Sequence, residues 1–252
     1  VYTYGCGFPD VITNVTFAGI NNTTGLTCGQ GANLGYDLIY SSPNPTIYQG
    51  ATYPISVSTG GDVEGVAIWI DYNNNLVFDP SELLYSGYAA TNPATYTASV
   101  LVPLTATVGT TRMRVRCVYA TTPTDPLAST TYGETEDYCV TIAAPPPCSG
   151  TPTLGNTASS LNPVCPSGNF TLSFTGSVIA TGITYQWQSG TSSTGPWTDI
   201  AGATNQTAVT SETVATWYRC DALCSNSGLH GTSTALQRSE EHTSELQSPY
   251  VI

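Results

Sequence analysis

The sequence predicts an all-β protein built of two β-sandwich domains. β-Branched and aromatic residues are plentiful, turn residues recur roughly every 8–12 positions, and no long segment has helical periodicity. The 252 residues are enough for two ordinary domains that each bury a core. Three consecutive prolines within residues 143–150 separate the two, because such a run favours polyproline II and cannot lie in a central strand.

The Pro-rich segment sets the expected boundaries. We place the first domain at residues 1–144, the second at 145–237 with a truncated last strand, and a tail at 238–252. Period-two alternation and short apolar runs mark the strands of the first domain, at 11–17, 52–58, 66–72, 95–102, 112–119 and 138–142. The same signals mark the strands of the second domain, at 170–174, 183–188, 207–210, 216–221 and 232–236.

The charge of the chain is sparse and one-sided. There are 17 acidic residues against five basic ones, all of them arginine. Nucleic acids and anionic membrane surfaces are bound through Lys and Arg that neutralise phosphates, so the composition argues against both as partners. An acidic surface rich in Thr, Ser and Asn suits a secreted bacterial protein that meets cations or neutral glycans.

The cysteine content points to an oxidising compartment. Eight cysteines occur without a Cys-x-x-Cys spacing and with only two histidines, which favours disulfides over zinc. The chain begins at Val1 without a signal peptide or an 18-residue apolar run. We therefore expect a fragment of a longer exported protein, secreted or at the cell surface, with no membrane insertion.

The tail at residues 238–252 breaks the strand pattern. Residues 238–248 resemble, codon by codon, the translation of a common short-read sequencing adapter. We therefore expect an artefactual, disordered tail whose deletion leaves stability nearly unchanged.

Residues 71–82 have the ligand spacing of a calcium loop. Oxygen side chains stand at loop positions 1, 3, 5, 9 and 12, directly after an apolar strand, and position 7 supplies a carbonyl. These residues predict a structural Ca²⁺ site, with ligands Asp71, Asn73, Asn75, Val77, Asp79 and Glu82. The plainer alternative is an Asn-rich β-turn with solvated acids.

A second acidic cluster, Glu134, Glu136 and Asp137, admits two main interpretations. The acids complete a cation site, or they pair across strands with the arginines that share one face of the strand at 112–119, Arg112, Arg114 and Arg116. Pairing is favoured for at least one acid, because this row holds most of the chain's positive charge. A paired-carboxylate glycosidase is a third interpretation, disfavoured because no substrate-shaping feature accompanies the acids.

Three motifs in order resemble the GEVED domain: residues 69–79, residues 112–116, and the sequence Tyr-Gly-Glu-Thr-Glu-Asp-Tyr at 132–138. The resemblance covers residues 1–143 and implies a β-sandwich of large secreted or surface-anchored bacterial proteins, found beside adhesive repeats and sometimes beside peptidase domains. Two positions depart from the family pattern. Thr135 replaces its Val, and Leu76 replaces the Gly at the sixth loop position, so Asn74 or Asn75 is expected to supply the left-handed conformation.

Residues 148–237 resemble the immunoglobulin-like repeats of bacterial surface proteins. Cys165, Trp187 and Cys220 have the spacing of that fold, and Tyr218 stands two residues before the second cysteine. The resemblance implies a core role for Trp187 and leaves Trp197, in a turn, as the exposed aromatic.

The same spacing implies a disulfide between strands, and the remaining cysteines follow by elimination within each domain. The expected pairs are Cys165–Cys220, Cys148–Cys224, Cys6–Cys28 and Cys117–Cys139.

These features predict a non-catalytic pair of extracellular modules, a calcium-stabilised stalk or adhesion segment. Its partners are neighbouring domains of the same polypeptide, and surface glycans or proteins. Two alternatives stay open: the accessory region of a secreted hydrolase, such as a peptidase, whose catalytic domain lies outside the chain, and a carbohydrate-binding module. No Ser-His-Asp arrangement is evident and all cysteines can pair, so we expect no enzyme active site.

Overall fold

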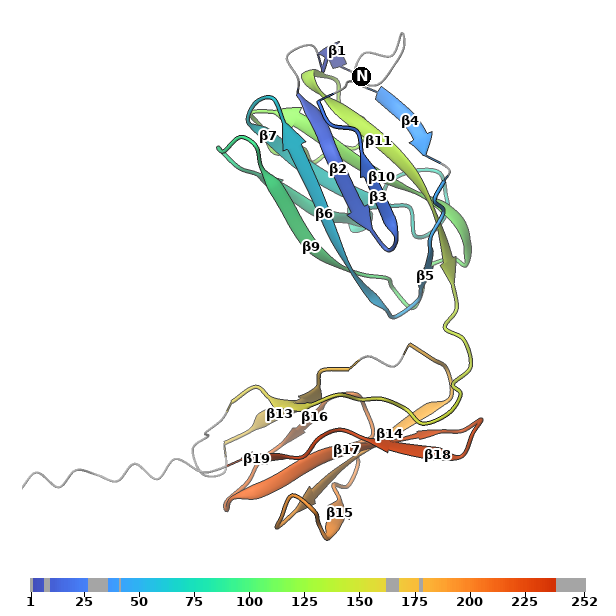
Figure 1. The fold of residues 1–252 in the computed structure, drawn as a ribbon, viewed down its shortest axis with the longest axis vertical. Coiled ribbons are helices and arrows are strands. Elements are labelled where there is room, and N and C mark those ends of the chain that lie inside the picture. The colour runs from blue at the N-terminus through green and yellow to red at the C-terminus, as the bar shows by residue number, and fades with distance from the viewer. Residues whose placement is uncertain are drawn as a thin grey trace, which may run out of the picture. The chain divides into compact units, whose positions relative to one another are not determined.

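A computed structural model of the chain describes residues 2–6, 10–26, 36–40 (backbone only), 42–161, 168–176 and 179–238 (Figure 1). The chain divides into two units, Val1–Pro145 and Pro146–Ile252, one residue from the boundary expected from the Pro-rich segment. Each unit consists of strands packed as two sheets, which confirms the all-β prediction. No helix in the described ranges is long and apolar enough to cross a membrane.

The larger sheet of the first unit has the order β1-β11-β10-β7-β8, and β4 and β5 add to β11 in parallel. Its strands are β1 (Tyr2–Gly5), β4 (Tyr36–Tyr40), β5 (Thr46–Tyr48), β7 (Glu64–Ile70), β8 (Leu83–Tyr88), β10 (Gly109–Tyr119) and β11 (Thr130–Ala143). The smaller sheet has the antiparallel order β3-β2-β6-β9. It contains β2 (Val11–Phe17), β3 (Ile20–Thr23), β6 (Thr52–Gly60) and β9 (Thr95–Leu101).

One core joins the two sheets of the first unit. It takes alternate residues of the strands that face each other, among them Val15 and Val57 from the smaller sheet and Ile68 and Val115 from the larger one. Strand β7 is buried at all seven positions because its second face is covered too: Trp69 packs there against Phe78. This double burial explains the uninterrupted apolar run before the predicted calcium loop.

In the residues that the structure describes, the second unit is a smaller sandwich of three strands against five. One sheet has the order β12-β13-β16, and the other has β15-β14-β17-β18 with β19 on β17. The strands are β12 (Thr157–Ser159), β13 (Phe170–Phe174), β14 (Ile183–Gly190), β15 (Trp197–Asp199), β16 (Ala208–Thr210), β17 (Thr216–Cys224), β18 (Leu229–Thr232) and β19 (Leu236–Arg238). Trp187 is fully buried in the core between the sheets, as predicted, and donates its indole N–H to the Asn205 carbonyl at 3.1 Å.

Of the two disulfides expected in the second unit, one is present. Cys148 and Cys224 form the predicted disulfide, with their Cα atoms 5.7 Å apart. Cys220 is a free, buried thiol, so the predicted Cys165–Cys220 bridge is wrong. The immunoglobulin pattern needs a cysteine inside the strand opposite Trp187. Cys165 instead precedes β13 by five residues, and it lies outside the described residues. The buried positions of β13 are occupied by Phe170 and Leu172.

The predicted Cys117–Cys139 bridge in the first unit is also wrong, because both thiols are free. In the ladder of β10 and β11, Cys117 lies opposite Glu134, and Cys139 lies five residues further along β11. Five residues of strand span roughly 17 Å, well beyond the reach of a disulfide. Cys6 is disulfide-bonded, while Cys28, its predicted partner, lies outside the described residues.

Arg238 belongs to the folded second unit, although we expected it to be the first residue of the tail at 238–252. It ends β19, is fully buried, and donates from Nη1 to the Ser159 hydroxyl at 2.5 Å. Its guanidinium carbon lies 3.7 Å from the ring centroid of Phe170, and its Nε lies 3.7 Å from Glu212. The start of the tail at residue 238 is therefore wrong, because an arginine can stack on an aromatic ring in a core and pair with an acid there. The rest of the expected tail, 239–252, lies outside the described residues.

Candidate functional site

The predicted calcium loop follows β7 and ends in the short 3₁₀ helix η1 (Pro80–Glu82). Its first and last acids, Asp71 and Glu82, are buried. The Asp71 carboxylate accepts hydrogen bonds from the backbone N–H groups of Asn75 and Leu76, at 3.2 and 3.0 Å. The Glu82 carboxylate accepts from three backbone N–H groups, those of Tyr72 (2.8 Å), Asn73 (3.1 Å) and Asp79 (2.9 Å). The two acids thus fix the backbone of the loop from both ends.

The middle of the loop brings the other predicted donors together. The side-chain amides of Asn73 and Asn75 both donate to Asp79 Oδ2, at 2.8 and 3.0 Å. Their amide oxygens accept from the backbone N–H groups of Asn75 (2.9 Å) and Val77 (2.8 Å). Because rotation of a carboxamide by half a turn exchanges its oxygen and nitrogen, each amide can present an oxygen on the side of Asp79.

The chemistry of this donor set suits Ca²⁺, which takes six to eight oxygens from carboxylates, amides and carbonyls. Within the described ranges, however, no group of three or more Asp, Glu, His or Cys side chains stands in an arrangement that could hold a metal ion. The loop therefore gathers the predicted ligands without completing a coordination sphere, and Ca²⁺ binding stays a prediction.

The loop contains backbone strain at the position where the family pattern has glycine. Leu76 itself has a φ of +70°, and Asn74 has +56°. The expectation for Asn74 is thus correct, but Leu76 also adopts the left-handed conformation. This conformation costs a non-glycine residue about 1–2 kcal/mol, and the Leu76 side chain is exposed, so little packing compensates for the cost.

We expect Leu76→Gly to raise the free energy of unfolding of the first unit by about 1 kcal/mol, because glycine adopts this φ without strain. Leu76→Ala is the matched control, since alanine removes the same side chain but keeps the strain. Urea unfolding of the three proteins measures the effect. Equal stability of the glycine and alanine variants would show that the conformation of Leu76 costs nothing.

The second acidic cluster is split by the alternation of β11. Asp137 faces the arginine row and forms a two-point ion pair with Arg114, with Nε–Oδ1 and Nη2–Oδ2 distances of 2.7 Å. Arg112 is a more distant partner at 3.6 Å. Both guanidinium carbons lie 5.2 Å from the ring centroid of Phe78. The predicted cross-strand pairing is therefore confirmed for Asp137.

Glu134 and Glu136 point the other way, into the sandwich. Both are fully buried and lie opposite Cys117 and Val115 on the core-facing side of β10. Glu134 accepts the backbone N–H of Ile12 at 2.7 Å, and Glu136 accepts the Tyr138 hydroxyl. The three acids do not form one cation site, and the two glutamates are too enclosed to act on a polysaccharide. The alternation of β11 thus separates Asp137 from the two glutamates.

Two buried acids, Asp10 and Glu64, were not expected from the sequence. Burial raises the pKa of Glu64 to about 10, and the neighbouring Asp10 carboxyl adds to the shift. Burial likewise raises the pKa of Asp10. The sequence signal for Glu64 is that it opens an otherwise apolar strand in a chain with few charges.

The second unit offers no open aromatic platform at Trp197. Its ring is half-buried, and the guanidinium carbon of Arg219 lies 4.5 Å from the ring centroid. The expectation of an exposed aromatic there is only partly met, because a cation covers one face.

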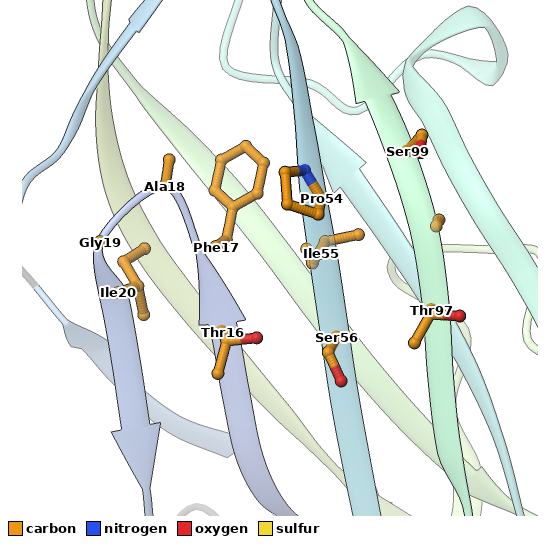
Figure 2. A pocket seen from close by; sticks show the side chains of 11 residues that line it. Thr16, Phe17, Ala18, Gly19, Ile20, Pro54, Ile55, Ser56, Thr97 and Ser99 are labelled. Carbon is orange, nitrogen blue, oxygen red and sulfur yellow. The ribbon is translucent and has the colours of Figure 1, made fainter.

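A hollow on the four-stranded sheet of the first unit is shown in Figure 2. Hydroxyl side chains of β2, β6 and β9 line it, namely Thr16, Ser56, Thr97 and Ser99, together with Pro54 and the turn that joins β2 to β3. None of its lining residues is acidic, basic, His or Cys. It therefore presents neutral hydrogen-bonding groups without a general acid or base.

Comparison with known proteins places a family within the first unit. Residues 65–141 match the GEVED domain. Among solved structures the chain is similar to murine CEACAM1b, with 13% identity, 81% of this chain and 98% of that chain covered, and a TM-score of 0.27. It is also similar to fibronectin(III)-like modules of Clostridium thermocellum CbhA, with 13% identity, 79% of this chain and 90% of that chain covered, and a TM-score of 0.24. For the mouse nectin-like molecule 4 ectodomain the identity is 12%, 77% of this chain and 61% of that chain are covered, and the TM-score is 0.26. A search of curated proteins gave no match.

Proposed function

We propose that this chain, which carries a GEVED domain match at residues 65–141, is a non-catalytic pair of extracellular modules stabilised by Ca²⁺ and acting as a stalk or adhesion segment. The main support for this proposal is the loop at 71–82, where two buried carboxylates fix the backbone and Asp79 accepts hydrogen bonds from two side-chain amides. The ligands proposed for the ion are Asp71, Asn73, Asn75, Asp79 and Glu82 with the Val77 carbonyl. An ion held there ties the end of β7 to the start of β8.

The site chemistry supports a binding or structural role over catalysis. Glu134 and Glu136 are shielded from substrate. His230 contacts Asp221 through Nδ1 at 2.7 Å, a partner that sequence reasoning missed, but within the described residues no serine or cysteine is hydrogen-bonded to it. The Cys148–Cys224 disulfide supports an oxidising, extracellular location.

Calcium is expected to raise the melting temperature of the first unit in the full chain, and a chelator to lower it. At a concentration 100 times its dissociation constant, one bound ion adds about 2.7 kcal/mol to stability. Asp79→Ala should abolish this response, while Asp62→Asn, an exposed acid in another turn, should keep it. Calorimetry with and without Ca²⁺ measures all three proteins. An equal calcium response in wild type and Asp79→Ala would refute the site.

A further inference from the structure

The interior of the first unit contains polar oxygens that no donor in the described part of the chain satisfies. Asp10, just before β2, and Glu64, the first residue of β7, are 1% and 0% exposed. Among the described residues, no N–H or O–H group donates to Asp10 Oδ1 or to either carboxyl oxygen of Glu64. The Thr59 hydroxyl, on the interior side of β6, likewise has no partner among the residues that the structure places. Such groups cost roughly 1–3 kcal/mol each when left unsatisfied, and more when charged.

The backbone brings the two residues to one end of the sandwich: Val11, next to Asp10, pairs with Gly60, and Glu64 follows the turn after Gly60. Asp10 and Glu64 form a side-chain hydrogen bond of the kind that joins a carboxylic acid to a carboxylate. Two ionised carboxylates only accept hydrogen bonds, so this contact requires a proton between them. A proton shared by the pair also supplies the donor that the surrounding residues do not.

The described surroundings of the pair are acidic or neutral. Asp62 in the β6–β7 turn and Glu134 on β11 both raise the proton affinity of Glu64. Two nearby donors point at backbone atoms: Cys117 Sγ donates to the Asp10 carbonyl at 3.6 Å, and the Tyr96 hydroxyl donates to the Glu64 carbonyl.

The arginines of the first unit that lie on β10 do not contact Asp10 or Glu64. The arginine row of β10 lies on the face opposite Cys117, because successive side chains of a strand alternate. Glu136 on β11 faces the same interior as Glu134 and adds a further acid. Neutralisation by a basic side chain is thus not seen in the described part of the unit, and a proton is the simplest counter-ion.

We infer that Asp10 and Glu64 share one proton at neutral pH and form an alkaline-sensitive latch between β2 and β7. When the proton passes to solvent, two carboxylates remain side by side in the interior, and their repulsion favours opening of this end of the sandwich. No other bond forms or breaks.

The sign of the pH dependence follows from Glu64. Its pKa rises from 4.5 to about 10 on folding, so the folded state holds a proton that the unfolded chain has released. The stabilisation is complete below about pH 4.5 and is lost as the pH rises towards 10. One linked proton changes the folding equilibrium constant by up to about tenfold per pH unit in that window.

The test compares the pH dependence of hydrogen exchange in β2 and β7 for the full chain and two variants, between pH 6 and 9, after correction for intrinsic exchange rates. Glu64→Gln keeps a donor beside Asp10 but cannot ionise, so its opening equilibrium should vary several-fold less per pH unit than that of wild type. Asp125→Asn removes an exposed acid of the same unit that does not act on Glu64, and it should retain the wild-type slope. Equal slopes for Glu64→Gln and wild type would overturn the inference.

A second measurement keeps the inference testable if Glu64→Gln does not fold. In wild type with ¹³C-labelled carboxyl groups, one buried glutamate should remain protonated at pH 7 and titrate in the alkaline range. A Glu64 signal that is ionised at pH 7 would refute the shared proton. A chelator-sensitive shift of that same signal would identify a metal cation in place of the proton, and would also refute it. Because Asp79→Ala tests the loop at 71–82 separately, failure of either proposal leaves the other intact.

Discussion

Asp137→Ala is expected to lower the free energy of unfolding of the first unit by about 3–5 kcal/mol. The substitution removes a carboxylate that pairs with Arg114 at two points, and the Arg114 side chain is only 7% exposed, so a buried ion pair is broken. Urea unfolding of the full chain, followed by hydrogen exchange of the β10 and β11 amides, measures the loss in the first unit.

Arg112→Ala is the control for the Asp137 prediction. Arg112 is 34% exposed and its nitrogen lies 3.6 Å from Asp137, so solvent screens the pair and its loss should cost at most about 1 kcal/mol. If Asp137→Ala costs no more than Arg112→Ala, the buried ion pair does not stabilise the sandwich as we argue.

The second large effect is expected from removing the disulfide of the second unit. Replacing Cys148 and Cys224 together by serine should cost about 4 kcal/mol in the chain-entropy description, because the bridge closes a loop with a sequence separation of 76. Thermal unfolding of the second unit under non-reducing conditions measures the change.

Cys220→Ala separates the effect of the bridge from that of cysteine removal. Cys220 is buried and free, so the variant loses packing but no cross-link, and a cost of about 1 kcal/mol is expected. A cost for the double serine variant no greater than this would mean that the disulfide adds no constraint. Alkylation under denaturing, non-reducing conditions should label Cys117, Cys139 and Cys220, because these three thiols are free.

The strand pattern was largely readable from the sequence because burial in a sheet has a period of two. The segment at 112–119 lies within β10, and the arginines occupy one face as expected. The spacing of the cysteines could not predict the disulfides, because it does not determine how neighbouring strands are aligned. Cys117 and Cys139 lie on adjacent strands, but the ladder places Cys117 opposite Glu134.

The site shows a similar division. The loop at 71–82 was predictable, since its ligand positions are consecutive in the chain and need only local folding. The split of the acidic cluster depends on which face of β11 points inward, which the neighbouring sheet decides. The contact between Asp10 and Glu64 joins residues far apart in sequence, so no local pattern announces it.

The placement of the Cys148–Cys224 bridge determines how the second unit responds to mechanical tension. A pull along the chain enters at Cys148, crosses the sulfur–sulfur bond to Cys224, and leaves through the residues that follow. The polypeptide between the two cysteines, including strands β12 to β16 and nearly all of β17, carries none of that force. Stretching can therefore peel away β18 and β19 but cannot lengthen the enclosed segment, so the unit extends only slightly while the bond is intact.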